Sequence, residues 1–153
     1  MIAVLQRVKS ATVYADGFLS GSIDEGLYIL LGVERNDSRE DARLLGEKIS
    51  KLRIFSDENG KMNLSVKDID GEVLVVSNFT LCANYAHGNR PDYLNAAPPK
   101  DADALYQYFV SFMRERVRKC ETGRFGSDML TDMKTDGPVT VVMNSSVLKG
   151  NKK

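Results

Sequence analysis

Apolar runs separated by short polar segments dominate the sequence. Residues 26–33 and 73–76 are almost continuously apolar, which is typical of strands buried on both faces. Asp16 and Gly17 form a turn signal between two further apolar segments and predict a hairpin there. Besides the two buried strands, we expect strands at residues 2–8, 11–14, 18–23, 52–55, 129–135 and 139–143, with a short edge segment at 61–66.

Two segments have the spacing of amphipathic helices. Asp37 or Ser38 can cap the first, whose apolar face carries Ala42, Leu45, Ile49 and Leu52. Asp101 is the expected cap of the second, whose buried face carries Leu105, Tyr108, Phe109, Phe112, Met113 and Val117. Two main helices against seven or eight strands predict an α/β fold. We expect a single domain over residues 1–153, with a layered mixed β-sheet or barrel-like core in α/β/β layers.

Three small polar side chains, Ser77, Asn78 and Thr80, follow the buried strand at 73–76. In layered α/β domains, loops converge on ligands at this end of a strand, so the three are candidate site residues. The alternative is a strand that simply ends in a polar turn.

Gly137 and Pro138 precede the apolar run 139–143. Proline is tolerated at the first residue of a strand, and a Gly-Pro bond can be cis. The pair is either a tight turn before an edge strand or a rigid pair of main-chain carbonyls presented to a ligand.

Together these stretches resemble the D-aminoacyl-tRNA deacylase family. Ser-Asn-Phe-Thr-Leu at 77–81 is similar to its Ser-Gln-Phe-Thr-Leu motif, and Thr-Asp-Gly-Pro-Val-Thr at 135–140 is similar to its Asn-x-Gly-Pro-Val-Thr motif. Asn78 stands where Gln is usual, and Thr135 where Asn is usual. The resemblance extends over essentially the whole chain through three more stretches, residues 1–8, 88–93 and 123–126.

The resemblance implies a hydrolase that cleaves the ester of D-aminoacyl-tRNA, rejects L-aminoacyl esters and also accepts glycine. As catalytic residues it implies Ser77, Asn78, Phe79 and Thr80. As the chiral filter and substrate-binding group it implies Arg7, Leu81, Gly137, Pro138, Val139 and Thr140, with Arg7 beneath the Gly-Pro turn. It further implies a homodimer whose site lies at the subunit interface, where the Gly-Pro turn of one subunit meets residues 77–81 of the other. The partner is the acceptor end of aminoacyl-tRNA.

Composition narrows the chemistry. The chain has 153 residues, 42% of them hydrophobic, which suffices for one domain with its own core. Cys82 and Cys120 make neither a disulfide framework nor a metal cluster, and His87 is the only histidine, so we expect no metal and no cofactor. No apolar run is long enough to span a bilayer, and the first residues lack signal-peptide features, so we expect a cytoplasmic protein without membrane contact.

Charge limits how RNA can be bound. Twenty-one basic and twenty-one acidic residues leave no net charge, so contact with tRNA should be local. The candidate basic residues are Arg114, Arg116, Arg118, Lys119, Lys149, Lys152 and Lys153. For each of them, a solvated helix face or chain terminus is the plainer interpretation.

An aminoacyl ester is already activated, so its hydrolysis mainly requires donors for the developing oxyanion and a positioned attacking oxygen. Backbone N–H groups around Phe79 and Thr80 are candidate donors. We favour Thr80 as a positioning group because no base is adjacent in sequence, with water or the ribose hydroxyl in the attack. Two alternatives stay open: a non-catalytic RNA- or protein-binding module of the same fold, or a small-ester hydrolase with Thr80 or Cys82 as nucleophile.

Overall fold

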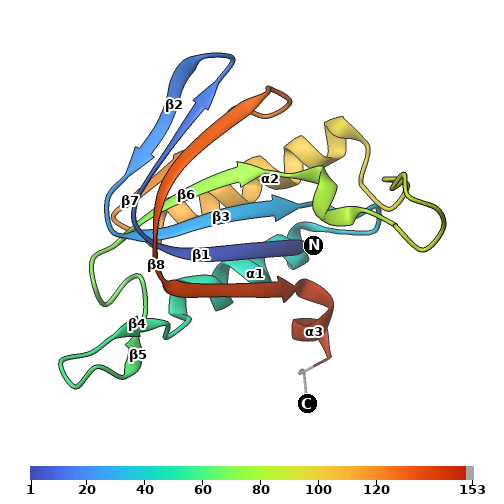
Figure 1. Ribbon diagram of the computed structural model, residues 1–153. Helices are drawn as coiled ribbons and strands as arrows, with labels where there is room; N and C mark the ends of the chain where they lie inside the picture. Colours follow the sequence, from blue (N-terminus) through green and yellow to red (C-terminus); the bar gives the residue numbers. More distant parts are fainter. Residues whose placement is uncertain (151–153) are drawn as a thin grey trace.

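The computed structural model describes residues 1–150, which form one mixed sheet, a small hairpin and the helices that cover them (Figure 1). The sheet runs in the order β2-β1-β3-β6-β7, and β8 pairs with the other edge of β1. Its strands are β1 (Ile2–Ala15), β2 (Phe18–Ile23), β3 (Gly26–Gly32), β6 (Glu72–Ser77), β7 (Lys119–Thr122) and β8 (Met129–Asn144). The hairpin consists of β4 (Phe55–Ser56) and β5 (Met62–Leu64).

β1 bends, and along one of its edges it pairs with two strands in succession. Its first half pairs with β3, and its second half pairs with β2. The bend carries β2 back to β7, where Ser20 Oγ donates to the Thr122 carbonyl at 3.0 Å and Lys119 Nζ donates to the Ser22 carbonyl at 2.8 Å. The sheet is therefore nearly closed, which confirms the predicted mixed-sheet, barrel-like architecture.

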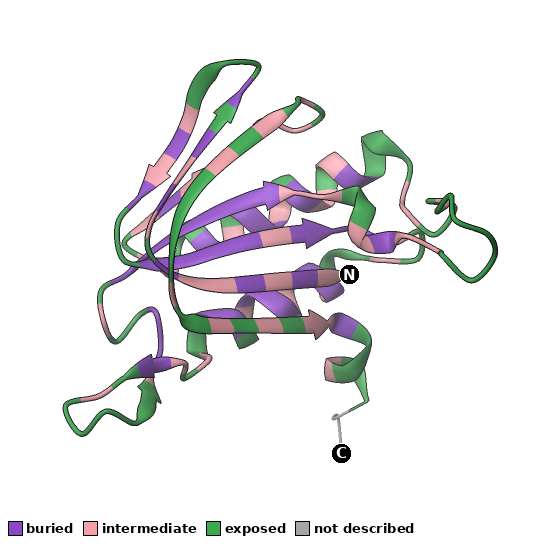
Figure 2. Ribbon diagram, in the orientation of Figure 1, coloured by how far each residue is buried: buried purple, intermediate pink, exposed green. Residues whose placement is uncertain are grey.

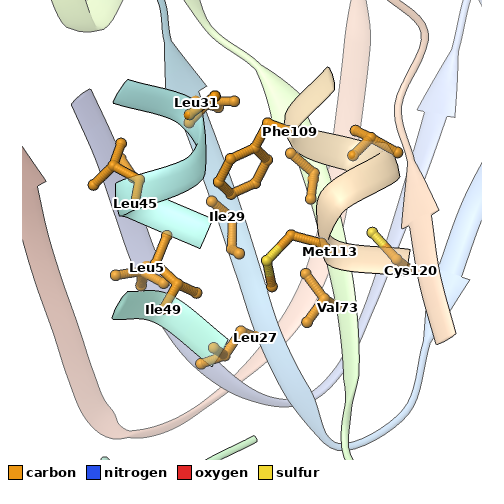
Figure 3. Packing of buried hydrophobic residues seen from close by; sticks show 14 of the residues in the cluster. Leu5, Leu27, Ile29, Leu31, Leu45, Ile49, Val73, Phe109, Met113 and Cys120 are labelled. Carbon is orange, nitrogen blue, oxygen red and sulfur yellow. The ribbon is translucent and has the colours of Figure 1, made fainter. Parts of the chain in front are cut away.

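Helices α1 (Arg39–Lys51) and α2 (Pro99–Arg114) cover one face of the sheet. Figure 3 shows Leu45 and Ile49 of α1 and Phe109 of α2 directed at Ile29 and neighbouring strand residues. Side chains alternate along the strands, so β3 and β6 contribute to this core Leu27, Ile29, Leu31, Val73 and Val75.

The opposite face of the same strands forms a second, smaller core. Tyr28 of β3 and Leu74 of β6 pack there against Val8, Val13 and Ile23, which come from the bent β1 and from β2. Because β3 and β6 are buried on both sides, they appear purple almost throughout in Figure 2. This explains their unbroken apolar sequence and confirms the expected layers of helix, sheet and further strands.

Several boundaries differ from those expected. Helix α2 begins at Pro99, so Asp101 lies in its first turn and is not its cap, and the helix ends before Val117. The stretch 52–55 is not a strand, since Leu52 ends α1 and pairing begins only at Phe55. Strand β7 and the short α3 (Ser145–Lys149) were not predicted.

The two strands expected around the Gly-Pro turn are a single strand, β8. Both of its halves pair with β1: Thr135 lies opposite Val8 and Thr140 opposite Gln6. Five residues thus separate positions on β8 that two residues separate on β1, so residues 136–139 bulge out of the strand. The Gly-Pro pair is a bulge within a strand and not a hairpin turn.

Candidate active site

The turn that follows β6 is held by the strands on both sides of it. β6 runs parallel to β3 and to β7, and Ser77 lies opposite Leu31 at its carboxyl end. The Asn78 N–H then donates to the Leu31 carbonyl at 2.8 Å, and a short 3₁₀ helix, η1 (Phe79–Cys82), begins. A Cβ on Gly32 of β3 would lie 2.9 Å from Leu81 Cβ and 3.0 Å from the Asn78 carbonyl oxygen, so the turn packs directly onto β3.

The Asn78 side chain caps η1. Its Oδ1 accepts a hydrogen bond from the Thr80 N–H at 3.2 Å and a short one from the Thr80 hydroxyl. Thr80 therefore donates its hydroxyl proton inward and directs only oxygen lone pairs outward. Within residues 1–150 the Phe79 N–H has no acceptor, so it is an available backbone donor of this turn.

A cavity of about 700 Å³ opens beside the turn. Ser77, Asn78 and Phe79 form one wall, and the first turn of α2 and residues 125–129 form the others. The lining includes two aromatic pairs: the Phe79 and Tyr93 rings meet edge to face at 5.0 Å, and the Tyr106 ring lies 5.9 Å from that of Phe125. The volume and lining suit a flat organic ring system with a polar group at the rim.

The lining was predicted only in part. The segments 88–93 and 123–126, noted above as similar to the family, contribute Tyr93 and Phe125 to it. Tyr106 was missed because the prediction placed Leu105 and Tyr108, and not Tyr106, on the buried face of this helix. Its hydroxyl donates to the Val75 carbonyl at 2.8 Å, and burial raises its pKa, so it remains protonated and structural.

Cys82 lies behind the turn and not in the cavity. Its side chain is buried, and its Sγ donates to the Val33 carbonyl at 3.5 Å. Burial raises the pKa of the thiol, which disfavours the thiolate needed for nucleophilic attack. Both observations argue against Cys82 as a nucleophile.

The second group of predicted residues gathers around the bulge of β8. Gly137 has a φ of +128°, and the Gly137-Pro138 bond is cis. Arg7 supports the bulge: its Nε lies 3.2 Å from the Asp136 carbonyl and 3.2 Å from Asp136 Oδ2, while Nη1 donates to the Ile54 carbonyl at 2.8 Å. Thr140 Oγ1 donates to Gln6 Oε1 at 2.8 Å, and Val139 is half-buried.

One chain does not bring the two groups together. Arg7 lies opposite Leu27 at the beginning of β3, whereas Ser77 lies opposite Leu31 near its end. Four strand residues correspond to about 13 Å. The bulge and the turn therefore lie at opposite ends of the central strands.

Most of the basic residues considered for RNA contact are engaged within the chain. Arg118 donates to Glu72 at 2.6 Å, and Lys149 pairs with Asp41 at 2.7 Å. The Arg116 guanidinium lies 3.3 Å from the centre of the Phe112 ring. Arg114 and Lys119 donate to backbone carbonyls, and Lys152 and Lys153 lie outside the described residues.

Residues 1–150 contain neither a cluster of metal ligands nor a helix able to cross a membrane. No group of three or more His, Cys, Asp or Glu side chains is arranged to hold a metal ion there. None of the helices in that range combines the length and apolar character needed to cross a membrane.

Comparison with known proteins identifies the family. A sequence model described as D-Tyr-tRNA(Tyr) deacylase matches residues 4–144. A D-aminoacyl-tRNA deacylase of Thermotoga petrophila is 50% identical over 148 residues, which cover 97% of this chain and 99% of that protein. A protein of the same name from Caldicellulosiruptor saccharolyticus is 52% identical over 145 residues, covering 95% and 97%.

Solved structures agree with that match. A structure described as c-Myc DNA Unwinding Element Binding Protein superposes with a TM-score of 0.89 at 37% identity, over 94% of this chain and 98% of that one. A probable eukaryotic D-amino acid tRNA deacylase shares the fold, with a TM-score of 0.83 at 14% identity over the same shares of the two chains. From the family match and the identities above, the chain belongs to the D-Tyr-tRNA(Tyr) deacylase family.

Proposed function

We propose that this chain hydrolyses the ester that links a D-amino acid to the terminal ribose of tRNA, releasing the free amino acid and the tRNA. The observation that carries the proposal is the turn at 78–80: Asn78 and Phe79 line the cavity, and the turn has a free Phe79 N–H and, at the next residue, the outward-facing Thr80 oxygen. The cavity has the size and lining for the terminal adenosine, and the turn lies where the ester would then be. The names of the relatives support the same activity.

Phe79 and Thr80 have separate roles in the proposed reaction. Water, assisted by the neighbouring ribose hydroxyl, adds to the ester carbonyl, and the developing oxyanion accepts a hydrogen bond from the Phe79 N–H. Thr80 accepts a hydrogen bond from the substrate or the attacking water and holds it in place. It is not the nucleophile, because its hydroxyl proton goes to the Asn78 amide oxygen, which is not a base. Collapse of the tetrahedral intermediate breaks the bond to the ribose oxygen, which takes up a proton.

Gly137 and Pro138 of a second copy complete the site as its chiral filter. In one chain the bulge lies about 13 Å along the strands from the turn, so a filter at the ester must come from a homodimer partner. Main-chain atoms contact the part shared by all amino acids, so the filter rejects an L side chain by collision whatever its identity. Each tenfold of selectivity requires about 1.4 kcal/mol. Glycine has no side chain to collide, and we expect its ester to be hydrolysed as well.

The direct test is hydrolysis of D-tyrosyl-tRNA and L-tyrosyl-tRNA by the purified protein. Rapid loss of the D ester alone supports both the activity and the filter, whereas loss of both esters supports the activity and refutes the filter. Folded protein that hydrolyses neither refutes the proposal and favours the binding module. Since the substrate occurs where translation takes place, we expect the protein in the cytoplasm.

The shared site has its own test. A Gly137→Ala variant and a Thr80→Ala variant, each of strongly reduced activity alone, should regain activity when co-expressed, because one of the two sites in a heterodimer keeps both intact elements. Inactivity of heterodimers verified by two different affinity tags would refute a filter supplied in trans.

A further inference from the structure

Residues 84–92 form a projecting loop that is closed at its base. The backbones of Asn84 and Asp92 exchange hydrogen bonds of 2.8 and 3.0 Å, and their side chains are joined by a third bond of 3.0 Å from Nδ2 to Oδ2. Asn84 Oδ1 also accepts from the Ala86 N–H, and Asp92 Oδ1 from the Leu94 N–H. The base is therefore pinned, while the tip extends away from the sheet at the right of Figure 1 and is exposed throughout in Figure 2.

Three side chains at the tip of the loop have no interaction partner within residues 1–150. Tyr85 is 81% exposed, and within residues 1–150 neither Tyr85 nor His87 nor Arg90 makes a hydrogen bond, ion pair or ring contact. Residues 85–91 include no acidic side chain. A largely exposed tyrosine and an unpaired guanidinium on one short loop of a net-neutral chain offer a locally cationic and aromatic surface. It contrasts with Arg118 and the other basic residues described above, which are engaged within the chain.

Both ends of the loop continue into the wall of the proposed active site. Asn84 follows η1 after one intervening residue, and Asp92 precedes Tyr93, whose ring packs on Phe79 at 5.0 Å. The loop therefore adjoins the cavity in which the proposed function places the last nucleotide of the RNA.

We propose that Tyr85 and Arg90 bind the unpaired nucleotides that precede the terminal adenosine of the tRNA substrate. Tyr85 stacks on a base, and Arg90 binds the phosphate that follows it. Unpaired bases stack on exposed aromatic side chains without regard to sequence, and arginine adds charge and cation–π attraction. The inference rests on the proposed function, since it takes the cavity as the place of the terminal adenosine.

The test compares two substrates that differ only in the RNA beyond the last nucleotide: D-tyrosyl-tRNA and the D-tyrosyl ester of adenosine. Tyr85→Ala should raise KM for the tRNA about tenfold, in line with the loss of one base stack, and leave kcat/KM for the adenosine ester within twofold. Tyr85→Phe should retain the wild-type KM, because it keeps the ring. Arg90→Gln should raise KM for the tRNA and reduce its dependence on salt by about 0.7 in the log–log slope, the value for one phosphate of a single strand.

Phe18→Ala and Lys61→Gln are the matched controls. Phe18 is 77% exposed at the β1–β2 turn, and Lys61 is exposed in the β4–β5 hairpin. Both variants should leave KM for the tRNA unchanged.

Three results would overturn the inference: an unchanged KM for Tyr85→Ala on the tRNA, an equal loss on the adenosine ester, or loss of the dimer in that variant, which would make the loop a subunit contact. Binding of uncharged tRNA, followed by fluorescence anisotropy, separates this inference from the proposed function. Wild-type protein that binds tRNA through Tyr85 but hydrolyses no ester would support the loop and refute the deacylase. Binding unaffected by Tyr85→Ala, with hydrolysis intact, would do the reverse.

Discussion

Asn78→Asp separates the structural role of this side chain from its electrostatic one. Asn78 accepts from both the N–H and the hydroxyl of Thr80. An aspartate of the same shape offers an oxygen in the same position and is a good helix cap, so the turn should keep its conformation. What changes is the charge, because Asn78 is only half-buried and an aspartate there, with an ordinary pKa of about 4, is ionised at neutral pH.

The size of the effect follows from the place of the charge. A carboxylate about 5 Å from an oxyanion held by the Phe79 N–H repels it by about 1 kcal/mol in bulk water and by about 3 kcal/mol at an effective dielectric constant of 20. Because the repulsion arises only as the oxyanion develops, it raises the barrier. We expect kcat on D-tyrosyl-tRNA to fall roughly 5- to 150-fold. The melting temperature should stay within about 2 °C, since the cap is preserved.

The assay is single-turnover hydrolysis with enzyme in excess, which reports the chemical step alone. Asn144→Asp is the matched control: Asn144 caps α3 by accepting from the Ser146 N–H at 2.9 Å, and it lies on a different segment from the turn. It should leave the rate unchanged. Wild-type single-turnover rates for Asn78→Asp, in a protein of unchanged stability, would refute the oxyanion site at this turn.

Three further outcomes are expected. Gly137→Ala places a Cβ 2.8 Å from the Val139 backbone nitrogen at a residue with a φ of +128°, so hydrolysis of D-tyrosyl-tRNA should fall at least about tenfold. The control is Gly60→Ala, where φ is +74° but the added Cβ meets open space, and this variant should only have a lower melting temperature. Burial opposes ionisation of Asp41, but hydrogen bonds led by that of Lys149 outweigh it and hold its pKa below the ordinary value. The stability it contributes is therefore present above the ordinary pKa of about 4 and is lost progressively as the pH falls below that value toward the lowered pKa. Denaturant titrations from pH 7 to 3 should show a weaker acid dependence for Asp41→Asn, and equal slopes would contradict this. Iodoacetamide should leave the activity of the folded protein intact, because Cys82 is only 3% exposed and burial raises the pKa of its thiol. Loss of activity in parallel with alkylation of Cys82 in the native protein would make Cys82 a candidate nucleophile again.

The elements that the sequence predicted well are those whose environment is the same along their length. Residues 26–33 and 73–76 are buried on both faces, so every position is apolar and the strand is unmistakable. The turn at 77–81 was found for the same reason, since polarity appears abruptly where burial ends. Strand β7 was missed because Lys119 and Glu121 are exposed partly at the sheet edge and leave no apolar run.

Features that depend on distant partners were outside the reach of local patterns. β8 is continuous through Gly137 and Pro138 because β1 bends beside it and pairs with both of its halves, which no window of the sequence reveals. The cavity likewise depends on how α2 packs, with the Tyr106 hydroxyl bound to the backbone of β6. The ion pair between Arg118 and Glu72 was out of reach for a related reason, since only the fold brings these two distant residues together.

The two departures from the family motifs both suit the backbone at which they occur. Asn78 has one methylene fewer than glutamine, so its oxygen reaches the N–H two residues ahead, and asparagine is among the best caps for a helix end. Thr135 pairs with Val8 as the last residue of β8 before the bulge, where a β-branched side chain is favoured over asparagine. At both positions, therefore, the residue present in this chain suits the local backbone conformation better than the usual motif residue does. The hydrogen bonds of the Asn78 side chain end within the turn itself, so the Phe79 N–H and the outward side of the Thr80 oxygen remain for the substrate.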